Sequence, residues 1–434
     1  MKKMIPGLDV LRFLLACYLV LYHTLPYYAE ADAMPLGQVF RLGGCATSIF
    51  FILSGFILSH VYVGTTGGEN IKISPSRFFI NRFTNLYPIH IITLLLAIAV
   101  MAVTSRPYDV YVSVVDSAPA IMHTMSTAEV AVNSVLQVLL LQAWNPFYLA
   151  FNIPAWSFST LLFFYLFFPI LAPRLISMRR KWTMLIAMWA ACLLPAIITV
   201  ANGWYGAWTI GTLHTNPLLR LPEFLAGILA YGIFAGHAEQ ITGFVARHRR
   251  IVILTLAAFY IGAAYLFADG PQSWKVLLHN GAILPAQIAL IFVSASVLQG
   301  ASLRAAGWAR RLGNASLSIF ALQIPLFTLF LKVQKALGIP YPLLSCFHRF
   351  HLCKDAARIV PLHFSAYPAY LVMILFASVL FQEKVIAPLR EPLRRMLTRR
   401  WGPPLPRKMP SPSDPSTWQG VVLGAKPDHT TSKT

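Results

Sequence analysis

The sequence predicts an all-α fold, a polytopic membrane helical bundle with about ten transmembrane helices. The first reason is composition: the 434-residue chain is 57% hydrophobic and only 12% charged, whereas soluble domains are about 25% charged. Its mean hydropathy is +0.63. The second reason is a series of apolar runs of about 17–25 residues, which suit helices that cross a bilayer and far exceed the strands of a membrane barrel.

The predicted spans follow one another along most of the chain. A shorter apolar segment at 132–144 is too short to span, so we expect it to be re-entrant or to lie in the membrane interface. The spans are expected near residues 8–28, 45–64, 85–105, 155–175, 183–202, 217–237, 251–268, 279–298, 314–334 and 366–388.

The net charge of +20 has a distribution that indicates topology. If the amino terminus is cytoplasmic, every loop on that side is basic, as the positive-inside rule requires. A nucleic-acid-binding surface would produce no such alternation, so we expect no nucleic-acid partner. An even number of spans then places both termini in the cytoplasm, and we expect the protein to be in contact with membrane lipid.

The chain divides into two unequal parts. Residues 1–390 form the predicted membrane-embedded domain. Residues 391–434 form a basic, proline-rich cytoplasmic tail with little apolar periodicity after Trp401, and we expect it to be disordered. The basic stretch at 390–400 is suited to the anionic inner leaflet.

The cysteines give little information about function. Cys346 and Cys353 share one predicted outside loop, where a disulfide is plausible in an oxidising periplasm. His348 and His351 lie between them, but the spacing matches no zinc pattern. We favour the disulfide or simple thiols and expect no metal site.

Arg12 and His23 lie within the first apolar run. Charged or titratable side chains are costly in a membrane helix and therefore indicate a functional site. Eleven residues at about 100° each bring both side chains to one face of one helix, about 16 Å apart along its axis. Asp9 is three residues before Arg12 and is expected to pair with it.

The second and third spans flank a basic loop. Gly55, after Ser54, allows another helix to approach closely. Arg77 and Arg82 follow the loop, just inside the membrane. Two roles are open for them, and both can hold together: anchoring of the helix by snorkelling, and an anion clamp, because guanidinium groups match phosphate geometry.

The sixth span carries Arg220 and Glu223, which are three residues apart and can pair on one face. The predicted topology places them near the outer surface, together with His23 and with Trp156 at the start of the fourth span. A buried ion pair that fixes helix register and a functional pair are equally open interpretations.

These residues resemble the acyltransferase-3 family of bacterial membrane acyltransferases. The family hallmark is Asp-x-x-Arg, ten residues, then His, which here is Asp9, Arg12 and His23. Five further motifs occur in the family's order, and the match as a whole covers about residues 5–390. They are FFILSGFIL (50–58), RFFINRFTNLYP (77–88), PAWSFSTLLFFYLFFP (154–169), LLRLPEFLAG (218–227) and LGNASLSIFALQIPLF (312–327).

Three positions depart from the family pattern. The family usually has Glu five residues after the fourth-helix Trp, where this chain has Leu161. A second Arg of the basic loop is replaced by Asn85, and a His of the late helix by Gln323. These replacements bear on the acceptor site and on activity, whereas the first-helix pair is intact.

The resemblance implies transfer of an acyl group, most often acetyl, from acyl-CoA to a sugar hydroxyl of a surface or exported glycan or a lipid-linked sugar. Arg12, Arg77 and Arg82 are then the candidates for binding the donor's phosphates. His23 is the candidate general base or acyl carrier. Trp156 and Arg220 are candidates for binding the sugar, and Arg220 and Glu223 for binding the glycan or stabilising the oxyanion.

Two other functions compete with this one. A transporter or flippase of a lipid-linked sugar also needs intramembrane charges and many helices, but such proteins often show internal repeats, and none is evident here. A degenerate, non-catalytic family member is the other, because Leu161 and Gln323 replace usual residues.

Overall fold

The computed structural model describes residues 5–31, 34, 37–63, 73–102, 109–113, 121–340, 356–357 and 360–401. The predictions for Cys346 and Cys353, and for the tail from 402 onward, lie outside these residues.

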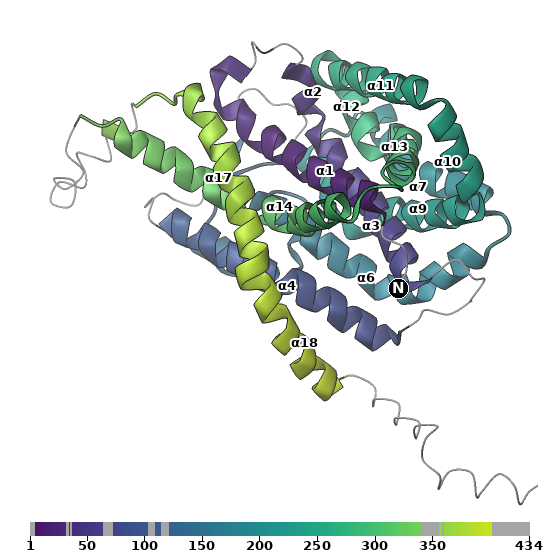
Figure 1. The fold of residues 1–434 in the computed structure, drawn as a ribbon. Coiled ribbons are helices and arrows are strands. Elements are labelled where there is room, and N and C mark those ends of the chain that lie inside the picture. The colour runs from purple at the N-terminus through teal and green to yellow at the C-terminus, as the bar shows by residue number, and fades with distance from the viewer. Residues whose placement is uncertain are drawn as a thin grey trace, which may run out of the picture.

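The described chain is an all-α membrane bundle, as predicted (Figure 1). In these residues, 9 helical segments are long and apolar enough to cross a membrane, and a bent pair brings the number to 10. The helices that form the single spans are α1 (Pro6–Thr24), α3 (Gly43–Tyr62), α4 (Pro75–Ala102), α6 (Trp156–Ser177), α7 (Lys181–Ala201), α8 (Ala207–Thr215) with α9 (Pro217–Gly236), α11 (Arg249–Asp269), α14 (Leu303–Leu337), and α17 (Tyr367–Leu380) with α18 (Ala387–Trp401).

The bent pair corresponds to the predicted span at 279–298. It consists of α12 (Gln272–Leu277), the π-helical segment η5 (Leu278–Ala282) and α13 (Leu284–Ser296), with a bend of 46°. The break falls at Asn280 and Gly281, and Gly281 has a φ of 111°, which a residue with a Cβ rarely adopts.

Close packing at the centre depends on small residues. A Cβ on Gly55 of α3 would lie 2.2 Å from the carbonyl oxygen of Phe224, and one on Gly227 of α9 would lie 1.9 Å from that of Ile52. The expected close approach at Gly55 is therefore confirmed, with α9 as its partner. A Cβ on Gly313 of α14 would lie 2.8 Å from the Cβ of Asp9 on α1, so these helices also approach closely.

The remaining described elements are short. They are α2 (Gly37–Arg41), α5 (Thr127–Val138), α10 (Ala238–Arg247), the paired strands β1 (Asp109–Tyr111) and β2 (Met122–Thr124), the 3₁₀ turns Leu25–Tyr27, Ala29–Ala31, Gln142–Trp144, Ile153–Ala155 and Phe364–Ala366, and the π-helical segment η7 (Phe381–Ile386). Helix α5 occupies the beginning of the segment that was too short to span. It buries Asn133 and Gln137 and exposes Val132 and Val135, so its apolar face points away from the protein.

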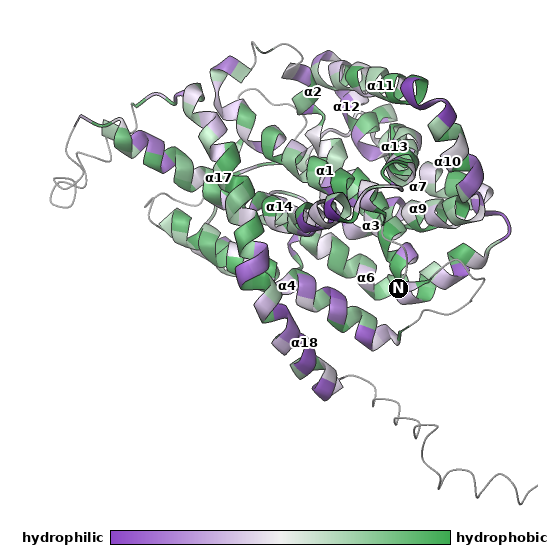
Figure 2. Cartoon of the chain, viewed as in Figure 1, coloured by the Kyte–Doolittle hydropathy of each residue, from purple (hydrophilic) through white to green (hydrophobic). Residues whose placement is uncertain are grey.

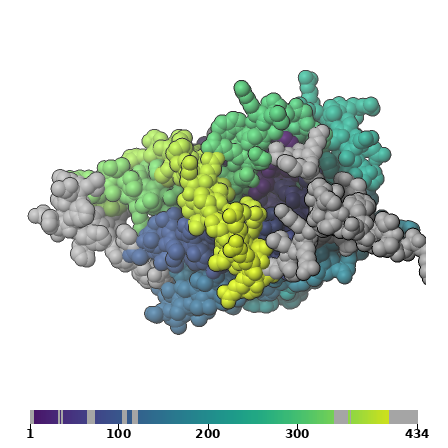
Figure 3. Space-filling model, turned by 60° about the horizontal axis from the view of Figure 1, so that its bottom comes forward, coloured from purple at the N-terminus to yellow at the C-terminus, as the bar shows by residue number. Residues whose placement is uncertain are grey.

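Helix α18 continues the last span and lies along α4 (Figures 1 and 3). The boundary predicted at residue 390 falls inside this helix, which continues to Trp401. Hydrophilic residues are concentrated along α18 (Figure 2). We call the side of the bundle that holds α18 and the start of α4 the basic side, and the opposite side, which holds the end of α1, the histidine side.

Candidate active site

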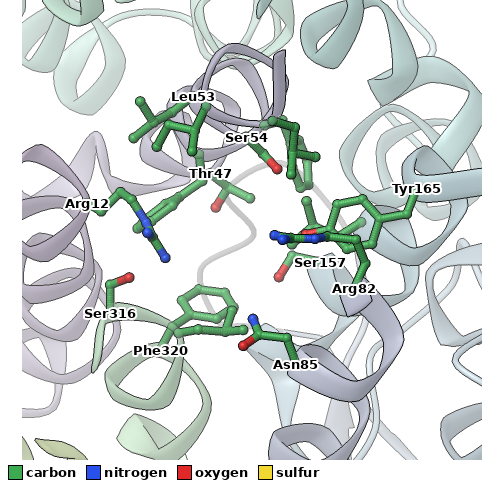
Figure 4. Close-up of a pocket in the computed structure, with 16 residues that line it drawn as sticks. Arg12, Thr47, Leu53, Ser54, Arg82, Asn85, Ser157, Tyr165, Ser316 and Phe320 are labelled. Carbon is green, nitrogen blue, oxygen red and sulfur yellow. The ribbon is translucent and has the colours of Figure 1, made fainter. Parts of the chain in front are cut away.

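A cavity of about 120 Å³ opens between α1, α3, α4, α6 and α14. Figure 4 shows the guanidinium groups of Arg12 and Arg82 pointing into it from opposite sides. Thr47, Ser157 and Asn85 add polar groups to its wall. The cavity therefore brings together two of the three arginines that the sequence indicated for anion binding.

Arg12 enters the cavity from the first helix. Its Nη1 lies 3.7 Å from Oδ1 of Asp9, so the predicted pairing of these side chains is confirmed. The Arg12 side chain is 27% exposed, and the long ion-pair distance leaves most of its donors for other acceptors. Arg82 lies within electrostatic range of Arg12.

Arg82 is held by aromatic side chains. Its Nη2 donates to the Tyr62 hydroxyl, and its guanidinium carbon lies 5.1 Å from the Tyr62 ring centroid and 6.0 Å from that of Phe78. These contacts orient the group without neutralising its charge. Arg77, more than a turn earlier on α4, is partly buried and is not among the residues that line this cavity.

The cavity extends toward the histidine side of the bundle. Its lining on α3 runs from Leu58 to Thr47, which is about 16 Å along a helix. On α6 it runs from Tyr165 to Ser157. Thr47 and Ser157 adjoin Ser48 and Trp156, so the far end of the cavity abuts a second polar cluster.

That second cluster is centred on the ion pair predicted for α9. Arg220 Nη1 lies 2.8 Å from Glu223 Oε1, and their side chains are only 3% and 2% exposed. Ser48 Oγ donates to the same carboxylate oxygen at 2.9 Å. Arg220 also donates to the carbonyl oxygens of His214 and His279, at 2.9 and 3.2 Å. Among the described residues, Arg220 Nη2 and Glu223 Oε2 are buried without a hydrogen-bond partner.

Two histidines of this cluster were not anticipated from the sequence. His214 Nδ1 and His279 Nε2 are 2.7 Å apart, and the rings are stacked with centroids 4.7 Å apart. His214 precedes Arg220 by only six residues, and His279 begins a His-Asn-Gly break at the start of an apolar run. Both signals were present, but only the folded chain brings the two rings together.

His23 lies at the edge of this cluster. It is within electrostatic range of His214 and interacts with Gln323 of α14. Within the described chain, His23 Nδ1 and Gln323 Oε1 are buried and have no hydrogen-bond partner. Because Arg12 lines a cavity with Ser316 and His23 faces Gln323, both side chains are directed toward α14. His23 itself is not among the residues that line the cavity.

Trp156 is packed between the two regions. It is 5% exposed, with ring centroids 5.8 Å from Phe51 and 4.9 Å from His214. Its stacking on a sugar stays a prediction, and in this structure its ring packs against protein.

The three departures from the family pattern all lie in this region. Leu161 and Asn85 line the cavity, and Gln323 faces His23. The changes therefore alter the polar groups in and beside the cavity. In the described residues, no group of three or more His, Cys, Asp or Glu side chains is arranged to hold a metal ion.

Comparisons with known proteins agree with the resemblance seen in the motifs. The chain is 28% identical over 247 residues to the acyltransferase MdmB of Streptomyces mycarofaciens. That alignment covers 52% of this chain and 56% of the relative, so it spans about half the length of each. No solved structure matches the chain. The family described as "Acyltransferase domain" matches residues 5–383, and the chain therefore belongs to this family of membrane acyltransferases.

Proposed function

We propose that the protein is an O-acyltransferase of the bacterial inner membrane that moves an acyl group, acetyl in the simplest case, from cytoplasmic acyl-CoA to a sugar hydroxyl of a surface or exported glycan. The single observation that carries the proposal is the cavity between Arg12 and Arg82. It begins among cations and leads toward the cluster that contains His23, Arg220 and Glu223.

The basic side suits the donor. The positive-inside rule assigns the side that holds α18 and the start of α4 to the cytoplasm, where acyl-CoA is made. Arg12 and Arg82 bind phosphate oxygens through charge-assisted hydrogen bonds, and Arg77 contributes at the mouth. The thioester arm then lies along α3 toward Thr47.

The histidine side suits the acceptor. His23 removes the proton of a sugar hydroxyl as its oxygen attacks the thioester carbonyl carbon. The tetrahedral intermediate collapses, the carbon–sulfur bond breaks, and the coenzyme A sulfur leaves and takes the proton from the imidazolium. In the alternative mechanism His23 first carries the acyl group itself.

The buried ion pair assists the acceptor half of the reaction. Arg220 Nη2 and Glu223 Oε2 have no partner in the described chain, so they retain one donor and one acceptor for a sugar hydroxyl or the oxyanion. Trp156 forms the adjoining apolar wall and binds the sugar ring after rearrangement of its neighbours.

The test uses the purified protein in nanodiscs with acetyl-CoA and glycan from a strain lacking the gene. Release of coenzyme A thiol and NMR of O-acetyl groups measure the reaction. His23→Ala should abolish both signals, whereas Cys17→Ala on the same helix should not. Normal acylation by His23→Ala ends the assignment, and absence of thioester consumption by the unmodified protein favours the flippase or non-catalytic alternatives.

A further inference from the structure

Helix α18 places Arg390 beside the basic end of the cavity, in contact with one of the residues that line it. Arg390 Nη1 donates to Asn85 Oδ1 at 3.3 Å, and Asn85 is one of the cavity-lining residues (Figure 4). Arg390 lies within electrostatic range of Arg82. Because α18 lies along α4, the contact is part of a helix packing and is not an isolated surface bond.

The positive charges of Arg12, Arg82 and Arg390 are not fully balanced by nearby carboxylates in the described chain. The Asp9 carboxylate lies 3.7 Å from Arg12, and Arg82 is held by a hydroxyl and two aromatic rings. Glu391, next to Arg390 in the chain, attracts it electrostatically but forms ion pairs with Arg394 at 2.8 Å and Arg395 at 3.2 Å. Among the described residues, Arg82 therefore lies within electrostatic range of both Arg12 and Arg390, with less than matching negative charge around the three guanidinium groups.

Such a cluster is unfavourable when empty and favourable when an anion binds. Like charges repel most where solvent is partly excluded, and a multiply charged anion removes the repulsion of all three groups together. Guanidinium groups are the side chains best suited to phosphate oxygens. A single carboxylate ligand carries too little charge to balance the cluster, whereas a nucleotide with several phosphates can do so.

We propose that Arg390 is a third phosphate-binding residue for the acyl donor, supplied by α18 and positioned by Asn85. This inference rests on the proposed function, and it assigns a binding role to a helix that begins after the residues matched by the family. Position 85 is the place where the family usually has arginine. Here Asn85 accepts a hydrogen bond from the guanidinium group of Arg390 on another helix. A cation therefore still lies beside this position, although it comes from a different part of the sequence.

The test measures binding of coenzyme A and of pantetheine, which lacks the nucleotide phosphates, to the purified full chain. Arg390→Ala should weaken coenzyme A binding by about tenfold or more, the size expected for loss of one charge-assisted contact. Pantetheine binding should not change. Arg395→Ala is the matched control, because Arg395 lies on the same helix and, in the part of the chain that the structure describes, forms its ion pair with Glu391.

A second variant separates binding from folding. Asn85→Arg in the Arg390→Ala background returns a guanidinium group to the cavity wall and should recover most of the lost affinity. Equal losses for coenzyme A and pantetheine, or no loss in Arg390→Ala, overturn the role of Arg390. If Arg12→Ala and Arg82→Ala weaken binding while Arg390→Ala does not, the proposed function stands and this inference fails.

Discussion

Arg220 and Glu223 form an ion pair with a separation of 2.8 Å and almost no exposure of either side chain. The pair joins three helices, because Ser48 of α3 donates to Glu223 and the carbonyl oxygen of His214 of α8 accepts from Arg220. Arg220 and Glu223 therefore hold helices of the histidine side together and are also candidates for its chemistry. Separate measurements of stability and of activity distinguish the two roles.

Removing one partner of this pair should destabilise the protein strongly. Glu223→Ala leaves an uncompensated buried guanidinium group, for which a loss of about 3–5 kcal/mol is expected. The double variant Arg220→Met, Glu223→Leu should recover much of that loss. Denaturant unfolding in detergent measures it. The control is Glu383→Gln, which breaks the exposed Arg311 pair and should cost little stability, because solvent screens exposed ion pairs; equal losses for the two pairs contradict this prediction.

Donor binding should depend more on Arg82 than on Arg77. Arg82 lines the cavity and Arg77 does not. We expect Arg82→Ala to raise the KM for acetyl-CoA by about tenfold or more and Arg77→Ala to raise it less. Steady-state kinetics with varied acetyl-CoA measure both values. A larger effect from Arg77 would place the phosphates outside the cavity.

The contacts within single helices of the site can be predicted from the local sequence, whereas the contacts between distant segments cannot. Helical periodicity alone predicts that Arg12 pairs with Asp9 and that Arg220 pairs with Glu223, because residues three apart share a helix face. The contacts of Asn85 with Arg390 and of His214 with His279 join distant segments, and no periodicity encodes them. The predicted shared helix face of Arg12 and His23 agrees with the structure, because both side chains face α14. Of the two, however, Arg12 lines the cavity and His23 does not.

The packing of α3 on α9 should tolerate no side chain at Gly227. A Cβ there would lie 1.9 Å from the Ile52 carbonyl oxygen, so Gly227→Ala forces the helices apart, at an expected cost of about 1–3 kcal/mol. Gly262→Ala on α11 is the control, because its added Cβ would meet no described atom within 4 Å apart from its chain neighbours and its own helix backbone. Thermal unfolding in detergent distinguishes them. A Gly227→Ala protein as stable as Gly262→Ala would contradict the close packing.

The segment around α5 should loosen in acid. A hydrogen bond from the Ser126 backbone, with further bonds from His123 and Ser126 side chains, lowers the pKa of Glu129 from 4.5 to about 2. A carboxylate whose pKa is lower in the folded than in the unfolded state stabilises the fold at pH values above its unfolded-state pKa. This stabilisation is lost as the pH falls through the folded-state pKa. Protection of residues 121–138 should therefore decline between pH 4.5 and 2. Hydrogen exchange, corrected for intrinsic rates, measures it; the Glu129→Gln variant should show a weaker decline, and an equal decline would exclude Glu129 as its cause.

Gln323 should affect turnover more than donor binding. Its side chain is fully buried and interacts with His23, while its Nε2 is fixed by the Phe320 carbonyl oxygen at 3.0 Å. Gln323→Leu has similar volume and removes the polar group that orients the imidazole, so we expect kcat to fall about 10–100-fold, in line with the contribution of a positioned base. Coenzyme A affinity should stay the same, because Gln323 does not line the cavity. The control is Gln334→Leu, farther along the same helix, where the side chain donates to His363. If Gln323→Leu weakens coenzyme A binding and leaves kcat unchanged, Gln323 acts on the donor site and the positioning of His23 must come from elsewhere.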